Sequence, residues 1–123
     1  MSQVIIQFYM ILRNGVKLYH WNTMSYPRHK ATDQFVENVD KLTDSFVEVY
    51  IGRYGRDPLM NKEMTLKLPA FNEKSIVTFL EESRVWLEKE IPKLIKPKDT
   101  DLFNIRDEIL AEINQALYLF TLK

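Results

Sequence analysis

The chain contains 123 residues, of which 46% are hydrophobic and 28% charged, so it fits a single domain over residues 1–123 and is neither disordered nor collagen-like. Its 17 basic residues equal its 17 acidic residues, and this balance argues against a protein that holds DNA by bulk charge. The sequence has no cysteine, which excludes disulfides and thiolate metal sites.

The N-terminal region carries no predicted targeting or membrane segment. The only long apolar run, from Val4 to Leu12, is far shorter than the ~20 residues that span a bilayer. The basic start and small-residue cleavage site of a signal peptide are also missing. We therefore expect no membrane partner and a location in the cytoplasm, or in the virion interior for a viral protein.

Apolar residues recur every three or four positions near the N-terminus, which predicts an amphipathic helix over about residues 3–22. Two features favour other structures: the run from Val4 to Leu12 has the composition of a buried strand, and Asn14-Gly15 is typical of a hairpin turn. A hairpin needs period-two alternation on both sides of its turn, and that is absent. Gly15 costs the helix about 1 kcal/mol relative to alanine unless close packing requires it. The expected buried residues are Ile5, Phe8, Leu12, Val16 and Tyr19.

A second helix is predicted over about residues 27–53. Pro27 suits a first helical turn, where its missing N–H costs nothing, and Gly52 and Gly55 stand where a helix is expected to stop. Its expected buried stripe consists of Phe35, Val39, Leu42, Phe46 and Val49 or Tyr50.

Two more helices follow a long connector. The connector, between Gly55 and Asn72, has two prolines and little helical period. The third helix is predicted over about 73–91, where Pro92 ends or kinks it, and the fourth over about 101–121. Their expected buried residues are Ile76, Phe79 or Leu80, Ser83, Trp86 or Leu87 and Ile91, then Leu102, Ile105, Ile109, Ile113, Ala116 or Leu117 and Phe120.

The length of the connector favours one topology. The second helix is ~40 Å long at 1.5 Å per residue, whereas an extended connector of about 17 residues reaches ~55 Å. The connector therefore has the length to cross the whole bundle, which lets the second and third helices run parallel. We expect an all-α, ferritin-like four-helix bundle, with an ordinary up-down-up-down bundle as the alternative.

The second helix carries an acidic stripe opposite its apolar stripe. The five carboxylates fall within roughly 80° of arc on a helix. They point away from the helix's own core, so any metal that they bind would be shared with another molecule packed on the outer face. The stripe consists of Asp33, Glu37, Asp40, Asp44 and Glu48.

Histidines and carboxylates together form a ligand set that suits iron, manganese or zinc. His29 with Asp33, and Asp44 with Glu48, are pairs four residues apart on one helical face, but Asp33 and Asp44 lie ~16 Å apart along the axis. A two-fold axis that lays this helix against its copy brings the histidine end of one chain to the acidic end of the other. Taken alone, the stripe fits a solvated helix face, and a lone His20 fits a packed residue.

These residues resemble the Dps family of miniferritins, the starvation-induced DNA-binding proteins. Tyr19-His20-Trp21-Asn22 is similar to the family's A-H-W-N segment, His29-x3-Asp33 to its H-x3-D and Asp44-x3-Glu48 to its D-x3-E. The likeness is strongest over residues 18–55, and the final helix is similar more weakly. The interval between His20 and His29 is about three residues shorter than the family's, and its lysine-rich N-terminal tail is missing.

The resemblance implies an intersubunit di-iron site that oxidises Fe(II) with oxygen or peroxide and stores the ferric product. His20, His29 and Asp33 would supply one side, Asp44 and Glu48 the other, and Trp21 would lie beside it. Iron, or another divalent metal, would be the cofactor, and the partner would be a second copy within a homodimer or a twelve-subunit shell. The missing tail argues against DNA binding. The alternative function is a ferritin-like bundle repurposed as a structural or assembly module, for example in a virion.

Overall fold

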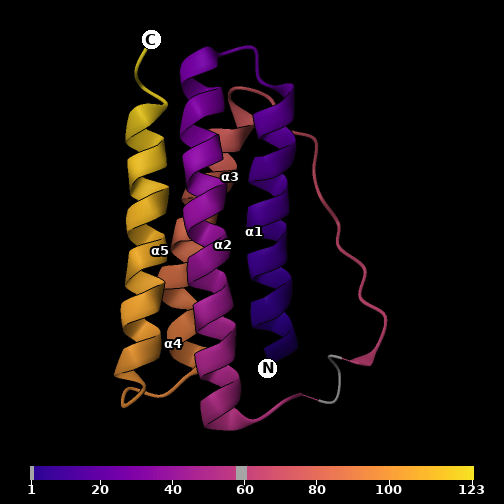
Figure 1. Ribbon diagram of the computed structural model, residues 1–123, viewed down its shortest axis with the longest axis vertical. Coiled ribbons are helices and arrows are strands. Elements are labelled where there is room, and N and C mark those ends of the chain that lie inside the picture. The colour runs from indigo at the N-terminus through magenta and orange to yellow at the C-terminus, as the bar shows by residue number, and fades with distance from the viewer. Residues whose placement is uncertain (1, 58–60) are drawn as a thin grey trace.

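The computed structural model describes residues 2–57 and 61–123, and these residues form four long helices with one short helical turn and no strand (Figure 1). The all-α prediction is confirmed. No helix in the described ranges has both the length and the apolar character to cross a membrane. The helices are α1 (Ser2–Asn22), α2 (Tyr26–Tyr54), α3 (Ser75–Lys89), α4 (Ile91–Leu94) and α5 (Thr100–Leu119).

Local caps explain where α2 begins and ends. The Ser25 hydroxyl accepts a hydrogen bond from the Arg28 N–H at 3.3 Å, and Pro27 follows in the first turn. Gly55 ends the helix with a positive φ of 81°, and its N–H donates to the Ile51 carbonyl at 2.7 Å. The helix is therefore one residue longer at each end than predicted.

A polar cap makes the third helix begin later than predicted. The Asn72 side-chain oxygen accepts hydrogen bonds from the N–H groups of Lys74 and Ser75, at 2.9 and 2.8 Å, so α3 begins at Ser75 instead of residue 73. The helix ends at Lys89, Glu90 separates it from α4, and Pro92 lies in the first turn of α4, where its missing N–H is tolerated. The last helix, α5, begins one residue earlier and ends two residues earlier than predicted.

The described part of the connector between α2 and α3, residues 61–74, runs back along the outside of the bundle beside α1 (Figure 1). As a result α2 and α3 run in the same direction, and α1 and α5 run opposite to them. Each of α2 and α3 packs against both α1 and α5. Helices that run in the same direction therefore lie diagonally opposite each other in the bundle. Contacts at the two ends agree: Tyr19 meets Glu73 at one end, and Arg53 meets Asp99 at the other.

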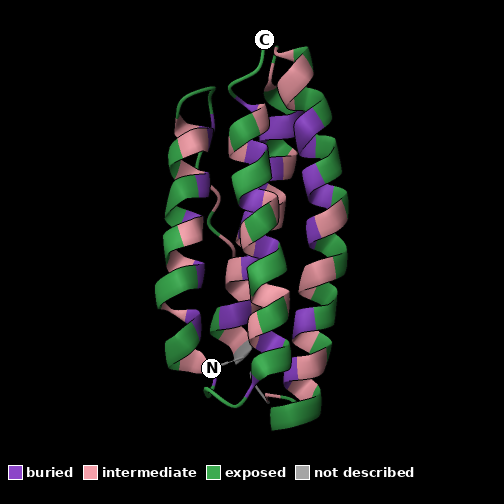
Figure 2. Cartoon of the chain, turned by 90° about the vertical axis from the view of Figure 1, so that its left-hand side faces the viewer, coloured by how far each residue is buried: buried purple, intermediate pink, exposed green. Residues whose placement is uncertain are grey.

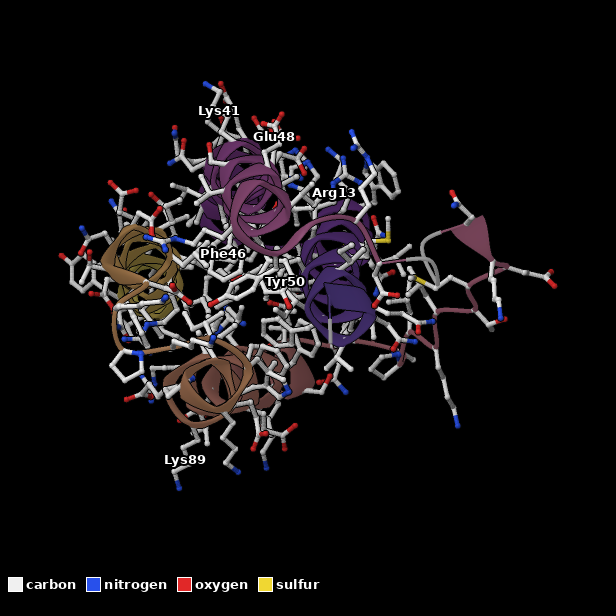
Figure 3. All side chains as sticks on the ribbon, turned by 90° about the horizontal axis from the view of Figure 1, so that it is seen from below. Arg13, Lys41, Phe46, Glu48, Tyr50 and Lys89 are labelled. Atoms are coloured by element: carbon white, nitrogen blue, oxygen red, sulfur yellow. The ribbon has the colours of Figure 1, made fainter. Side chains whose placement is uncertain are left out.

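The core lies between the four long helices, where the buried positions gather (Figure 2). Most predicted inward residues are buried, and Leu42, Val49, Phe8 and Ile105 are partly buried at its edge. Figure 3 shows Phe46 and Tyr50 pointing into the centre, and Arg13 and Glu48 pointing outward. The apolar side of α2 therefore faces the bundle, and its acidic side faces solvent.

Close packing explains the glycine inside α1. A Cβ atom on Gly15 would lie 3.0 Å from the ring of Phe79 and 3.1 Å from that of Phe71. We expect Gly15→Val to lower the free energy of unfolding by about 1–3 kcal/mol, because the added carbons overpack this contact. In Gly52→Val, whose site has nothing within 4 Å, we expect a change below about 0.5 kcal/mol. Denaturant titration measures both values, and equal losses would contradict the packing argument.

A hydrogen-bonded pair ties the end of α2 to the turn before α5. The Tyr54 hydroxyl donates to the buried Asp99 carboxylate, which also accepts the Lys96 N–H at 2.9 Å and lies 3.1 Å from Arg53 Nη1. The hydrogen bond from Tyr54 holds the pKa of Asp99 below its usual value of 3.8. Because the folded state has the lower pKa, the stabilisation is present above about pH 4 and is lost as the pH falls through the folded pKa.

We therefore expect Tyr54→Phe to melt at a lower temperature than the parent chain at pH 7, with a difference that shrinks below pH 4. Tyr26→Phe, at an exposed tyrosine on the opposite end of α2, should melt as the parent does at both values. Melting curves from circular dichroism measure this. A Tyr54→Phe difference that stays constant with pH would show that the carboxylate is not involved.

Candidate functional site

The two histidines meet across the short turn between α1 and α2. His20 lies near the end of α1 and is buried, whereas His29 lies in the first turn of α2 and is exposed. Their rings stack with centroids 4.0 Å apart and planes 16° apart. The interval between them is shorter than in the Dps family, but the structure still brings both imidazoles together.

The hydrogen-bond partners of each histidine favour a proton on its Nδ1 atom. His29 Nδ1 lies 3.0 Å from the His20 carbonyl oxygen, which only accepts, so this nitrogen donates. His20 Nδ1 lies 2.9 Å from the Thr32 hydroxyl oxygen. Thr32 donates its single proton to the Arg28 carbonyl at 2.8 Å, so it accepts from His20.

In that tautomer Nε2 of each ring carries no proton, and the side-chain hydrogen bonds of both rings use Nδ1. This is the arrangement of metal-binding histidines, in which Nδ1–H bonds to the protein and Nε2 faces the ion. Burial lowers the pKa of His20 below its usual value of 6.5, and the neighbouring His29 lowers it further. His20 is therefore a neutral imidazole at pH 7, which is the form that binds metals.

The acidic stripe of α2 is exposed along its whole length. Two of its carboxylates have partners within the chain: Asp40 is 3.0 Å from Arg13, and Glu37 is 3.9 Å from Lys41. The other three make no hydrogen bond or ion pair with the described residues. They are Asp33, Asp44 and Glu48, the carboxylates predicted as metal ligands.

One copy of the chain does not gather these ligands. Among the described residues there is no group of three or more histidine and acidic side chains placed to hold a metal ion. His20 and His29 are in contact, and Asp33 lies one helical turn from His29. Asp44 lies ~16 Å from Asp33 along the axis of α2, and Glu48 lies one turn farther. A complete ligand set therefore needs a second molecule.

The stripe has a symmetry that favours such a partner. From His29 the next two steps of four residues reach Asp33 and Glu37, and from Glu48 two steps backwards reach Asp44 and Asp40. The pattern is thus symmetric about the point between Asn38 and Val39. An antiparallel copy of α2 centred there sets the level of His29 against Glu48, and that of Asp33 against Asp44.

Sequence reasoning missed two features of this region. Thr32, which orients His20, is a buried polar residue three positions after His29, and its place on the side of α2 that faces α1 was the available signal. The second is a groove between α1 and α2 beside the stripe.

Trp21, predicted as a residue near the site, follows His20 directly, and 68% of its surface is exposed.

Comparison with known proteins identifies the family. DUF5856, a family of unknown function, matches residues 20–120. The chain belongs to this family. It is also similar to an uncharacterized 14.6 kDa protein of enterobacteria phage T4, encoded in the mobD-ri intergenic region, with 33% identity over 104 residues that cover 85% of this chain and 75% of the relative. No solved structure matches the chain.

The assignment to the Dps family is therefore wrong. The DUF5856 match covers both histidines and the whole acidic stripe, which are the residues that carried the resemblance. Short patterns of acidic residues four apart also arise on any solvated helix, because that spacing places charges on one exposed face. The support for metal ligands in this DUF5856 member therefore comes from its own geometry alone.

We expect Thr32→Val to disturb both histidine orientation and metal affinity. The variant removes the oxygen that accepts from His20 Nδ1–H, which leaves a buried donor without a partner at a cost of about 1–3 kcal/mol. Loss of such an orienting partner typically lowers metal affinity about 10- to 100-fold. Long-range ¹H–¹⁵N spectra of the imidazoles report the tautomer. The control is Ser83→Ala on α3, whose hydroxyl donates only to the Phe79 carbonyl of its own helix. An unchanged His20 spectrum would refute the orienting role.

Proposed function

We propose that this DUF5856 member is a ferritin-like bundle that binds Fe(II) or another divalent metal between two antiparallel copies. His20, His29 and Asp33 of one copy and Asp44 and Glu48 of the other form the ligand set. The observation that carries the proposal is the stacked histidine pair, in which Nδ1 of each ring hydrogen-bonds to the protein.

The direction of the helices supports the ferritin-like description. A long crossover joins α2 to the parallel α3, and two antiparallel pairs flank it (Figure 1). In this arrangement α2 presents its acidic side outward, so a metal site on it faces another molecule and not the bundle interior.

Charge supports a cation between the copies. In the antiparallel pair the unpartnered carboxylates of Asp33 and Asp44 come to the same level, and like charges at close range repel. A bound divalent ion removes this repulsion, and imidazoles that bind the ion add nitrogen ligands without adding charge. Imidazole and carboxylate together suit iron, manganese and zinc.

Oxidation of the bound Fe(II) by oxygen or peroxide, with storage of the ferric product in a larger shell, is a further step of the proposal. It rests on the same ligand set, because carboxylates stabilise the ferric ion. Metal binding is tested first, since oxidation depends on it.

A second candidate function is a structural or assembly module without metal. The exposed apolar side chains at the turn between α1 and α2 favour it, with Trp21, Met24 and Tyr26 exposed by 68%, 98% and 69%. Such side chains gather at surfaces that meet a partner. The phage origin of the relative is compatible with a role in a virion.

Anaerobic titration with Fe(II) across a range of protein concentrations separates the two functions. The proposal expects binding that strengthens as the chain dimerises, with the dimer followed by analytical ultracentrifugation in the same buffer. Addition of oxygen or peroxide to the loaded protein then measures oxidation. A chain that dimerises and takes up no Fe(II), Mn(II) or Zn(II) would leave the assembly module as the function.

A further inference from the structure

A groove of about 420 Å³ lies between α1 and α2, directly beside the acidic stripe. Its walls include the apolar side chains of Ile6, Met10 and Val47, and Asp44 lies along its rim. In Figure 3 the labelled Arg13 and Glu48 mark this outer side of the two helices. The volume lies within the ~300–1,000 Å³ of pockets that enclose aromatic ligands, so it has room for an indole ring.

Trp21 extends the α1 wall of the same face. Met10, Asn14, Lys17 and Trp21 follow one another at intervals of four, three and four residues, so they lie in one line along α1. The ring of Trp21 is largely exposed, and Lys17 Nζ lies 5.3 Å from its centroid. The groove and the indole are therefore on one surface, near opposite ends of α1.

Contacts between the helices set the level of each residue. Tyr9 packs on Phe46 with ring centroids 5.2 Å apart, and His20, next to Trp21, stacks on His29. The groove thus lies at the level of residues 40–47 of α2, and Trp21 lies near the level of residue 29. Antiparallel pairing about the point between Asn38 and Val39 brings the level of residue 29 to that of residue 48 in the other copy.

We propose that Trp21 of each copy inserts into the α1–α2 groove of the other. The inference rests on the proposed antiparallel pairing, and it names the contact that holds the two metal-binding halves together. Two indoles are buried per dimer by symmetry. An aromatic side chain in a fitted pocket is the usual energetic centre of an interface.

Charge at the groove fits the same occupant. In the antiparallel pair Lys17 moves with Trp21 to the side of the groove that Asp44 lines, one helical turn from Glu48. The proposed ligand set holds three carboxylates against the two positive charges of the ion, so the Lys17 ammonium offsets the remaining negative charge. This complementarity favours a second copy over an apolar small molecule as the occupant of the groove.

The fluorescence of Trp21 tests the insertion. Trp86→Phe leaves Trp21 as the single tryptophan and keeps an aromatic ring on Phe8, with which Trp86 stacks at 3.9 Å. We expect acrylamide quenching of this variant to fall at least twofold as protein concentration rises through the dimerisation range measured by ultracentrifugation. The measurement is made in metal-free buffer and again with Fe(II) under argon.

Two substitutions complete the test. Trp21→Ala should raise the dimer dissociation constant by about 30-fold or more, the size of an interface hot spot. Tyr118→Ala, which removes an exposed aromatic ring from the outer side of α5, should leave it within about threefold.

The outcomes separate this inference from the metal proposal. A dimer that binds Fe(II) while Trp21 stays fully quenchable would overturn the insertion and leave the metal site standing. A dimer that protects Trp21 but binds no metal would support the insertion and remove the metal site. A chain that stays monomeric at every concentration, with and without metal, would overturn both.

Discussion

Replacing Asp44 and Glu48 together by alanine is expected to lower the affinity for Fe(II) by about 100-fold or more without unfolding the bundle. In the proposed site these two carboxylates supply one whole side of the ion, and loss of even an orienting neighbour costs a site about 10- to 100-fold. Both side chains point away from the core, so their loss leaves the packing of α2 intact. Anaerobic calorimetry measures the affinity, and circular dichroism measures the helix content.

The matched control removes two carboxylates from another helix. Glu81→Ala with Glu88→Ala makes the same change of net charge on the exposed side of α3. We expect it to bind Fe(II) as the parent chain does. If the two double variants lose affinity equally, the metal responds to overall charge and the intersubunit site is wrong.

Arg28→Met is expected to lower the free energy of unfolding by about 2–3 kcal/mol, because hydrogen bonds from a charged group contribute more than neutral ones and two of the three acceptors are partly buried. The Arg28 guanidinium donates to the carbonyl oxygens of Glu73 and Phe120, at 2.6 and 3.3 Å, and to the Tyr19 hydroxyl at 3.2 Å. It also lies 4.7 Å from the ring of Phe120. One side chain thereby joins α1 and α2 to the residues just before α3 and just after α5.

Lys30→Met is the control for charge and for the surrounding helix. Lys30 is exposed, and its ammonium lies 6.0 Å from the ring of Tyr26. Its replacement should change the free energy of unfolding by less than about 0.5 kcal/mol. Guanidinium titrations compare the two variants. A loss of the same size in both would assign the effect to charge alone, and a loss below about 0.5 kcal/mol in Arg28→Met would mean that its acceptors bind water instead.

Much of the fold was predictable because the apolar spacing is regular. Ile5, Leu12 and Val16 in α1, and Ile109 and Ile113 in α5, are all buried where their periodicity placed them. Helix ends were harder to predict, since they depend on individual capping atoms. Asn72, for example, caps two N–H groups and so delays the start of α3, a choice that periodicity does not reveal.

The candidate site was predictable in part. The outward direction of Asp33, Asp44 and Glu48 follows from their spacing against Phe35 and Phe46, and the structure agrees. The two imidazole rings stack across a turn, and their Nδ1 atoms bond to Thr32 and to the main chain. Residue spacing does not specify these three-dimensional contacts. The family assignment failed for a related reason, since a few matched intervals describe one helix face and not a whole chain.

The connector between α2 and α3 also bears on how the chain folds. It separates two antiparallel hairpins, α1 with α2 and α3 with α5, and touches α1 through a hydrogen bond from the Gln7 side chain to the Thr65 carbonyl at 3.2 Å. Contacts within a hairpin join residues near one another in sequence and form early, whereas contacts between hairpins close long loops. We therefore expect the docking of the two hairpins to be the slow step of folding, at a rate that depends on the length of the segment that tethers them.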